Sequence, residues 1–285
     1  MSHRERRDVT GEESRMQTLT IDGGKLAYAD DGTGNAVVLI HGFLLDHTIW
    51  DGLVPRLAMH ARVLRPDVRG LGRSSVTPGP YLMELLASDV AALLDAKGIS
   101  TATIVGHSLG GYVALSFFRM YRERVERLAL VGSRFAPDTA AAANDRYALA
   151  DRAEREGIAP VIEAFLPRFF APEVYAHNAD LVAQTASLCS RTDPHGAAAH
   201  LRGAAQRVDS RDLVEDIDVP FLFAIGDADA IMGLSETETI VPRVGTAKLA
   251  LLRDCGHMPM LEATDQLAAA LDAFVASAGK SIVGS

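Results

Sequence analysis

A serine between two glycines is the residue of this chain best suited to chemistry. It lies in the segment Thr103-Ile-Val-Gly-His-Ser-Leu-Gly-Gly111, where Gly106 and Gly110 flank Ser108. A strand-like run precedes the serine and a helix-like run follows it. A sharp strand-to-helix turn lifts the middle side chain out of a sheet, and the glycines leave room for neighbouring backbone. The pattern predicts that Ser108 is a nucleophile beside a helix N-terminus, which stabilises developing negative charge.

A serine hydroxyl is a poor nucleophile at neutral pH unless a base accepts its proton. The chain has nine histidines, and His257 in Asp254-Cys-Gly-His-Met-Pro259 follows a strand-like run and precedes the final helix. This loop should lie at the carboxyl end of the sheet, near Ser108. We therefore predict that His257 is the general base.

The acid that orients the histidine is expected at the end of another strand. The segment Gly226-Asp-Ala-Asp229 follows such a strand and offers two carboxylates, Asp227 and Asp229. Their spacing alone does not distinguish them, and either one could instead cap the following turn.

Backbone N–H groups are expected to bind the oxyanion that forms during attack. His41-Gly42-Phe43 forms a tight turn at the end of the first buried strand. We predict that the N–H groups of Phe43 and Leu109 form an oxyanion hole.

The elements that position these residues alternate between strands and helices. We expect two strands within residues 18–29, joined by a Gly-rich hairpin turn, and single strands at 36–40, 61–64, 101–105, 128–131, 220–225 and 248–252. Helices are expected at 51–59, 83–97, 109–121 and 264–276. This alternation predicts an α/β fold with a doubly wound, mostly parallel eight-stranded sheet, covered by helices on both faces.

Residues 134–218 interrupt this rhythm. The stretch is Ala-rich and charged, contains no convincing strand, and is divided by prolines into short helices. We predict a helical insertion between two strands of one sheet. The expected organisation is a solvated tail over residues 1–16, a core of 17–133 and 219–285, and the insertion at 134–218.

Composition excludes several classes of protein. The chain has 285 residues, 48% of them apolar, and a formal charge of −9, which disfavours nucleic acid or anionic membranes as partners. There is no membrane-length apolar run, and the opening residues lack the apolar stretch of a secretory signal, so a cytoplasmic protein is expected. Cys189 and Cys255 are too isolated to suggest a disulfide framework or a thiolate metal site.

Together these motifs resemble the α/β-hydrolase superfamily over residues 19–276. The segment Asp67-Val-Arg-Gly-Leu-Gly-Arg-Ser74 looks like the family's D-x-R-G-x-G-x-S loop, to which we assign a structural role. The resemblance implies that Asp229 is the acid, because it occupies the last position of a family G-x-x-D pattern, with Asp227 as the alternative. It also implies that residues 134–218 are a lid or cap over the nucleophile.

The resemblance also implies a type of reaction. Haloalkane dehalogenases and epoxide hydrolases of this fold use Asp at the position of Ser108, and hydrolases of carbon–carbon bonds usually resemble Gly-Asn-Ser-Met-Gly-Gly, from which His107 departs. Carboxylesterases and small lactonases fit better. We expect hydrolysis of small, fairly apolar esters or lactones through an acyl-enzyme, without metal or organic cofactor. Carbon–carbon bond hydrolysis, perhydrolysis as a side activity, and a slow-turnover ligand receptor remain as alternatives.

The predicted insertion carries the residues that would select a substrate. Its aromatic and aliphatic cluster consists of Phe165, Leu166, Phe169 and Phe170, which line an apolar acyl pocket or form the core of the cap. We predict substrate contacts from Phe43, Phe169 and Phe170. Five arginines either include a carboxylate anchor or form solvated helix faces, namely Arg134, Arg146, Arg152, Arg155 and Arg168.

Overall fold

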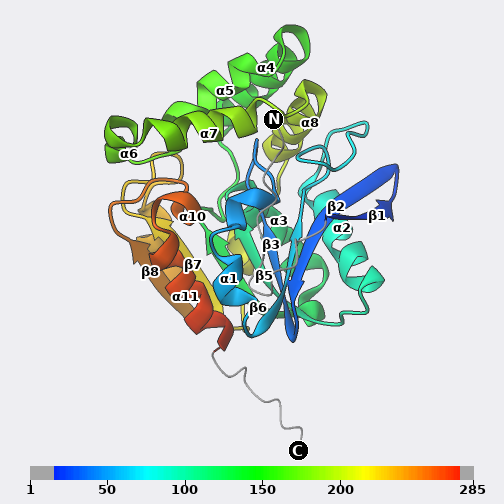
Figure 1. The fold of residues 1–285 in the computed structure, drawn as a ribbon, viewed down its shortest axis with the longest axis vertical. Helices are drawn as coiled ribbons and strands as arrows, with labels where there is room; N and C mark the ends of the chain where they lie inside the picture. The colour runs from blue at the N-terminus through cyan, green and yellow to red at the C-terminus, as the bar shows by residue number, and fades with distance from the viewer. Residues whose placement is uncertain (1–15, 277–285) are drawn as a thin grey trace, which may run out of the picture.

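A single eight-stranded sheet forms the centre of the molecule (Figure 1). The computed structural model describes residues 16–276, so the predicted tail, except for Met16, lies outside the described residues. The strands are β1 (Gln17–Ile21), β2 (Gly24–Gly32), β3 (Asn35–Ile40), β4 (Ala61–Pro66), β5 (Ala102–His107), β6 (Val125–Val131), β7 (Phe221–Gly226) and β8 (Ala247–Leu252). Their order in the sheet is β1-β2-β4-β3-β5-β6-β7-β8.

Most of the sheet is parallel, as the sequence predicts. Strand β2 pairs antiparallel with β1 and with β4, whereas each pair from β4 through β8 is parallel. Every residue of β5 and β7 is buried, which explains why their sequences are mostly apolar. The edge strand β8 instead exposes Lys248, Leu249 and Leu251.

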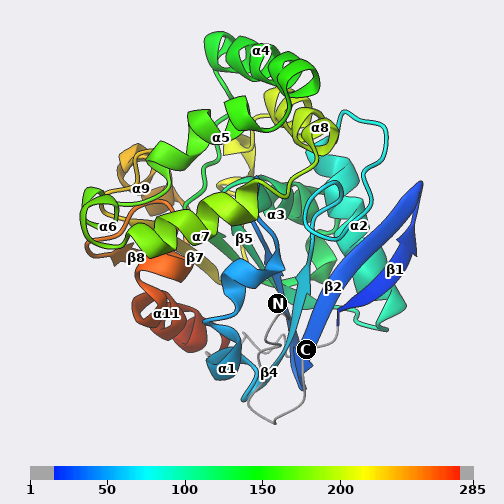
Figure 2. The same cartoon turned by 45° about the horizontal axis from the view of Figure 1, so that its top comes forward.

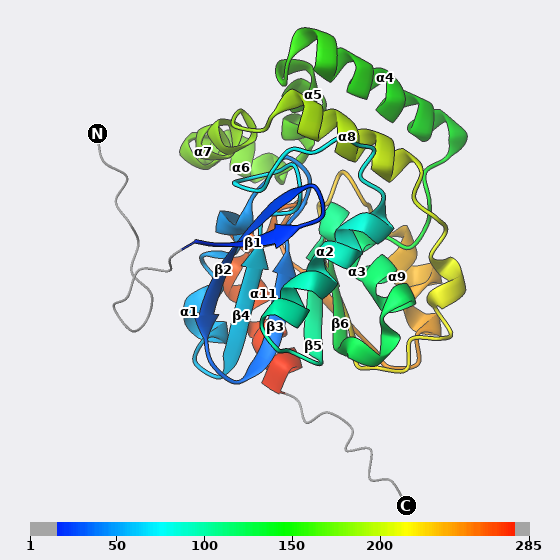
Figure 3. The ribbon, with the colours of Figure 1, turned by 90° about the vertical axis from the view of Figure 1, so that its right-hand side faces the viewer.

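Helices cover both faces of the sheet, which confirms the doubly wound architecture. The helices are α1 (Val54–Leu57), α2 (Met83–Ala96), α3 (Leu109–Met120), α4 (Ala140–Glu156), α5 (Ala159–Phe165), α6 (Pro172–His177), α7 (Ala179–Cys189), α8 (Pro194–Ala205), α9 (Ser235–Thr239), α10 (Pro259–Glu262) and α11 (Thr264–Ala276). Helices α2 and α3 lie on one face, and α1 and α11 lie on the other (Figure 3).

The helix predicted at 51–59 is shorter than expected. A 3-10 turn, His47–Trp50, precedes it, and the α-helix itself spans only Val54–Leu57. Pro55 accounts for the late start, because proline fits the first turn of a helix but lacks the N–H that a later position would use.

Residues 134–218 form the five helices α4 to α8 and contain no strand. Pro160, Pro172 and Pro194 each lie in the first turn of one of these helices, as their missing N–H favours. The helices gather at the end of the molecule toward which the parallel strands run (Figures 2 and 3). At the base of this segment, Ser210 N donates to Phe135 O at 3.1 Å, so its two ends lie together.

The D-x-R-G-x-G-x-S loop is held by buried polar contacts. Asp67 accepts hydrogen bonds from the backbone and ring nitrogens of His47 at 2.8 and 2.7 Å. Arg69 forms a two-pronged ion pair with Asp89 at 2.8 and 2.6 Å, and both side chains are buried. Arg69 also donates to the carbonyl of Asp22 at 2.7 Å. These contacts join the β1–β2 turn, the loop and α2.

Two further findings concern the classes of protein considered from composition. Cys189 and Cys255 are both free and buried, and burial raises the pKa of Cys189 to about 12. Among residues 16–276, none of the helices combines the length and apolar composition needed to span a bilayer.

The ion pair between Arg69 and Asp89 gives a test of this fold. We expect Arg69→Met to lower the free energy of unfolding by about 3 to 5 kcal/mol, because it leaves a buried carboxylate without its counter-charge. The double variant Arg69→Met/Asp89→Leu should recover much of that loss. Urea unfolding followed by circular dichroism measures both, and an equal loss in the two variants would contradict the expectation.

Candidate active site

Ser108 occupies a strained turn between β5 and α3. Its backbone φ of 52° and ψ of −114° is uncommon for a residue with a side chain, and such strain persists only where the surroundings enforce it. A Cβ atom at Gly106 would lie 2.1 Å from the carbonyl oxygen of Gly110, and one at Gly110 would lie 2.2 Å from that of Ile40. Both positions therefore require glycine, for the close approach that the sequence predicts.

A chain of hydrogen bonds links the three side chains expected to do chemistry. Ser108 Oγ lies 2.9 Å from His257 Nε2, and His257 Nδ1 lies 2.9 Å from Asp229 Oδ2. His257 and Asp229 are 2% and 6% exposed, whereas Ser108 is only partly buried. Ser108 is thus more exposed than the two groups behind it, which are shielded from water.

Asp229 is held as a carboxylate. Its second oxygen accepts hydrogen bonds from the backbone N–H groups of Ile231 and Met232 at 2.8 and 2.9 Å. Burial raises the pKa of Asp229, but His257 and these two donors outweigh burial and lower that pKa to about 2. The carboxylate stays charged at neutral pH and can stabilise a positively charged imidazole.

The structure separates the two carboxylates that the sequence leaves open. Asp227 accepts a hydrogen bond from Cys255 N at 3.2 Å and lies 3.9 Å from Arg253 Nη1. Asp227 therefore binds the backbone of the loop that carries His257, whereas Asp229 contacts the imidazole itself.

Two polar residues that sequence reasoning did not assign also support the site. The Nε2–H of His107 donates to the backbone carbonyl of His257 at 2.8 Å, and Ser133 Oγ donates to the carbonyl of Ser108 at 2.8 Å. Burial and the neighbouring His257 lower the pKa of His107 to about 3, so His107 is neutral. The position of His107 inside the Gly-x-Ser-x-Gly segment could have indicated its role from the sequence, whereas no sequence pattern indicates the role of Ser133.

Of the two predicted oxyanion donors, Leu109 directly follows Ser108, and the turn before Phe43 packs close to it, since a Cβ atom at Gly42 would lie 3.2 Å from Ser108 Cβ. Leu109 is the first residue of α3, so its N–H has no acceptor one turn earlier within the helix. Among residues 16–276, no group accepts a hydrogen bond from the N–H of Phe43. The turn is fixed by His41, whose Nδ1–H donates to Gly42 O at 2.8 Å and whose Nε2 accepts from Val68 N at 2.9 Å.

Comparison with known proteins assigns a family to this geometry. A family model described as the alpha/beta hydrolase fold matches residues 35–264, which is most of the chain. The chain belongs to the alpha/beta hydrolase fold family.

Solved structures of this family are similar over nearly the whole chain. An esterase from Thermogutta terrifontis is 32% identical, with a TM-score of 0.88, covering 92% of this chain and 98% of that one. An enol-lactonase from Burkholderia xenovorans is 27% identical, with a TM-score of 0.85, covering 91% and 99%. Curated relatives from Mycobacterium tuberculosis and Mycobacterium bovis are 37% identical over 118 residues, and this chain spans 35% of their length.

Several aromatic rings of this alpha/beta hydrolase contact the histidine or the helical segment. The ring of Phe43 lies 5.3 Å from that of Phe165 in an edge-to-face arrangement, and the ring of Phe169 lies 6.2 Å from that of His257. Phe170 instead packs its ring against Tyr175, at 5.8 Å. Phe43 therefore contacts the helical segment and Phe169 contacts the ring of His257, whereas the ring contact of Phe170 is with α6.

The arginines of residues 134–218 are engaged with protein groups. Arg134 and Arg168 donate to the carbonyls of Ile231 and Ala230 at 2.8 and 3.0 Å. Acidic side chains pair with the others: Arg146 with Asp138, and Arg152 and Arg155 with Glu156. None of these contacts favours a carboxylate anchor over a structural role.

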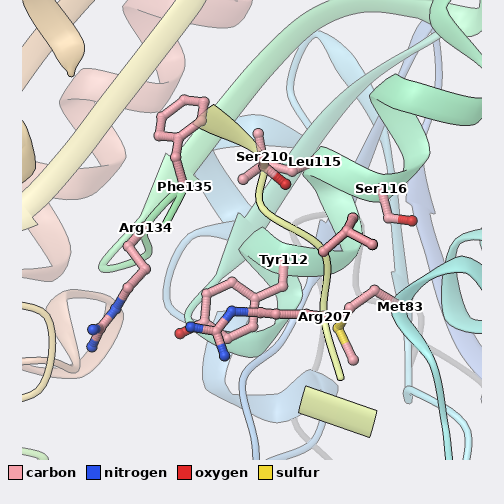
Figure 4. A pocket seen from close by; sticks show the side chains of 9 residues that line it. Met83, Tyr112, Leu115, Ser116, Arg134, Phe135, Arg207 and Ser210 are labelled. Atoms are coloured by element: carbon pink, nitrogen blue, oxygen red, sulfur yellow. The ribbon is translucent and has the colours of Figure 1, made fainter. Parts of the chain in front are cut away.

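A small cavity lies at the base of the helical segment, away from Ser108. Tyr112 and Arg207 are among the residues that line it, with the guanidinium 4.3 Å from the ring centroid (Figure 4). Its volume of about 10 Å³ is room for about one water molecule. A larger cleft, of about 430 Å³, lies outside α8 against the loop at Pro78 and Gly79. Neither is lined by the candidate catalytic residues.

One group of side chains in the described residues has the composition of a metal site. Candidate ligand atoms of Asp46, His47 and Asp67 lie within 4.8 Å of one another. However, Asp67 binds the backbone and ring of His47, and Asp46 accepts from Thr48 N at 2.9 Å. These contacts account for the cluster as a support for the turn after Phe43.

Buried neutral histidines should make this hydrolase fold sensitive to acid. His200, on α8, is fully buried and donates to Arg69 O at 2.7 Å; burial lowers its pKa to about 3, like that of His107. Between pH 6.5 and 3, these two imidazoles bind protons in the unfolded chain but stay neutral in the folded protein. The free energy of unfolding should therefore fall as the pH falls, by up to about 1.4 kcal/mol per pH unit for each imidazole.

Urea unfolding between pH 6.5 and 4.5 measures this slope. The slope of the unfolding free energy against pH should be smaller for His200→Gln than for wild type, by the contribution of one imidazole. Identical slopes for the two proteins would refute the assignment.

Proposed function

We propose that this protein is a serine hydrolase that cleaves carboxylic esters or lactones of small, fairly apolar substrates through an acyl-enzyme. The observation that carries the proposal is the continuous hydrogen-bond chain from Ser108 through His257 to Asp229. Its nucleophile is partly accessible at a helix N-terminus, and its base and acid are buried. This is the arrangement that activates a hydroxyl for attack on a carbonyl carbon.

The first half of the reaction forms the acyl-enzyme. Ser108 Oγ attacks the ester carbonyl while His257 Nε2 accepts its proton, and the carbonyl oxygen becomes an oxyanion. The N–H groups of Phe43 and Leu109 are the proposed donors to that oxyanion. As the tetrahedral intermediate collapses, His257 returns the proton to the leaving alcohol.

The second half releases the acid. A water molecule gives a proton to His257 Nε2 and attacks the acyl carbon, and the second tetrahedral intermediate expels Ser108, which recovers the proton. Throughout, Asp229 holds Nδ1–H of the imidazole and offsets its positive charge, which its low pKa permits. For a lactone, the alcohol and acid leave as one hydroxy acid.

The proposed substrate pocket is apolar. The ring of Phe169 packs beside the base and that of Phe43 against Phe165, and we propose that these three rings form the wall of this pocket. Phe165 and Phe169 belong to residues 134–218, for which we propose the role of a cap that sets substrate choice. This wall suits an aliphatic or aromatic acyl group better than a charged one.

Similarity to other proteins supports the ester or lactone class. The Thermogutta terrifontis protein is an esterase and the Burkholderia xenovorans protein is an enol-lactonase, and both match this chain over more than nine-tenths of its length. No contact described above favours carbon–carbon bond cleavage or a receptor role, so these alternatives become outcomes of the experiment below.

Replacement of the proposed nucleophile tests the reaction class. We expect Ser108→Ala to lose at least about 1,000-fold in kcat/KM on a short p-nitrophenyl ester, because the substitution removes the hydroxyl that is hydrogen-bonded to His257 Nε2. A panel of esters, lactones and a vinylogous diketone, run on both proteins, ranks the substrate classes. Retained activity in Ser108→Ala would contradict the proposal. Turnover of the diketone alone would favour carbon–carbon hydrolysis, and slow turnover throughout would favour a receptor.

The two aspartates form a matched pair for testing the acid. We expect Asp229→Asn to lower kcat by about 10³- to 10⁴-fold, because the amide no longer holds the correct tautomer of His257 or offsets its charge. Asp227→Asn should cost less than about 10-fold, since its contact is with loop backbone. Steady-state kinetics with the same ester measure both, and the reverse order of effects would assign the acid to Asp227.

A further inference from the structure

A second carboxylate lies close to the proposed base and takes no part in the reaction described above. Glu262 is the last residue of α10, five positions after His257, and its side chain turns back toward that histidine's loop. Oε2 accepts hydrogen bonds from Ala171 N at 2.7 Å and Gly256 N at 3.0 Å, and Oε1 accepts one from Met258 N at 2.9 Å. Glu262 thus binds the backbone on both sides of His257.

The same loop is tied directly to the helical segment. His257 N donates to the carbonyl of Phe169 at 2.8 Å. A Cβ atom at Gly256 would lie 2.4 Å from Ala171 N, so the two backbones touch there. These contacts join three parts of the chain into one unit, namely residues 169–171, residues 256–258 and Glu262.

The carboxylate of Glu262 is well suited to holding the backbone of this loop. Three N–H donors converge on one carboxylate, and hydrogen bonds to a charged acceptor are stronger than those between neutral groups. Burial raises the pKa of Glu262 although the three donors and His257 act to lower it. A carboxylate that is partly buried is costly to maintain, and an apolar residue here would leave three N–H groups without this acceptor.

We propose that Glu262 is a positioning residue that fixes the imidazole of His257 relative to Ser108 and to the aromatic wall at Phe169. This inference rests on the proposed function, because it assigns a role toward the base of that reaction. Glu262 sets the path of the loop backbone, and the side chain of His257 follows. Movement of residues 169–171 therefore displaces the base as well as the pocket wall.

Variants of Glu262 test the proposal on the full-length protein. Glutamine keeps the shape but turns an N–H donor toward a backbone N–H, and alanine removes the acceptor entirely. We expect kcat for a p-nitrophenyl ester to fall about 10-fold in Glu262→Gln and about 100-fold in Glu262→Ala, with KM changed less than 3-fold, because small misplacement of a base slows chemistry more than binding. The rate at which a fluorophosphonate labels Ser108, followed by mass spectrometry, should fall in parallel.

Glu236 provides the matched control. Its carboxylate also accepts two backbone hydrogen bonds, from Phe135 N at 2.7 Å and Ala136 N at 3.0 Å, at the base of the helical segment. Glu236→Gln should lower the melting temperature while changing kcat less than 2-fold. The different responses separate a role in positioning the base from a general loss of stability.

The outcomes are distinguishable from failure of the proposed function. Wild-type kcat and labelling rate in folded Glu262→Gln would overturn the positioning role, as would equal losses of kcat in Glu262→Gln and Glu236→Gln. Failure of the proposed function has a different signature, namely turnover that persists in Ser108→Ala. If Glu262→Ala does not fold, Glu262→Gln decides the question alone.

Discussion

Close backbone packing at the Ser108 turn is the constraint around which the rest of the site is arranged. The carbonyls of Gly110 and Ile40 lie where side chains would stand at Gly106 and Gly110, so the turn can be this sharp only with glycine at both positions. The turn holds Ser108 at positive φ, and the helix that follows begins beside it with free N–H groups. Strand β3, which pairs with β5, delivers the Phe43 turn to the same edge of the sheet.

The histidine loop meets this turn through backbone as well as side-chain contacts. His107, inside the turn, binds the carbonyl of His257, and Phe169 binds its N–H. Both backbone groups of His257 are therefore held by residues distant in sequence. The imidazole itself is held by a third distant residue, since its Nδ1 lies 2.9 Å from Asp229 Oδ2.

Sequence reasoning recovered the features that depend on local pattern. Buried strands, amphipathic helices and the Gly-x-Ser-x-Gly turn have short-range signals, and the mostly parallel eight-stranded sheet followed from the alternation of strand and helix, whereas the order of its strands came from the structure. The helix at 51–59 was overestimated because Pro55 delays its start. The choice between Asp227 and Asp229 needed either family resemblance or the structure. The sequence alone does not show which of two carboxylates, two residues apart, points toward the imidazole. His107 and Ser133 bind backbone groups far away in sequence, and Glu262 joins nearby backbone to the distant Ala171 N, contacts that the sequence does not show.

The place where residues 134–218 leave and rejoin the sheet determines how freely the sequence of this segment can vary. Strands β6 and β7 are neighbours, and Ser210 bonds to Phe135, so the segment departs and returns at almost one point. Its length and helix arrangement can therefore vary without altering the register of any strand. If the segment selects the substrate, specificity and catalysis are largely separate modules, joined where residues 169–171 touch the histidine loop. An exchanged segment would need to preserve that short stretch, while the remainder is free to diverge.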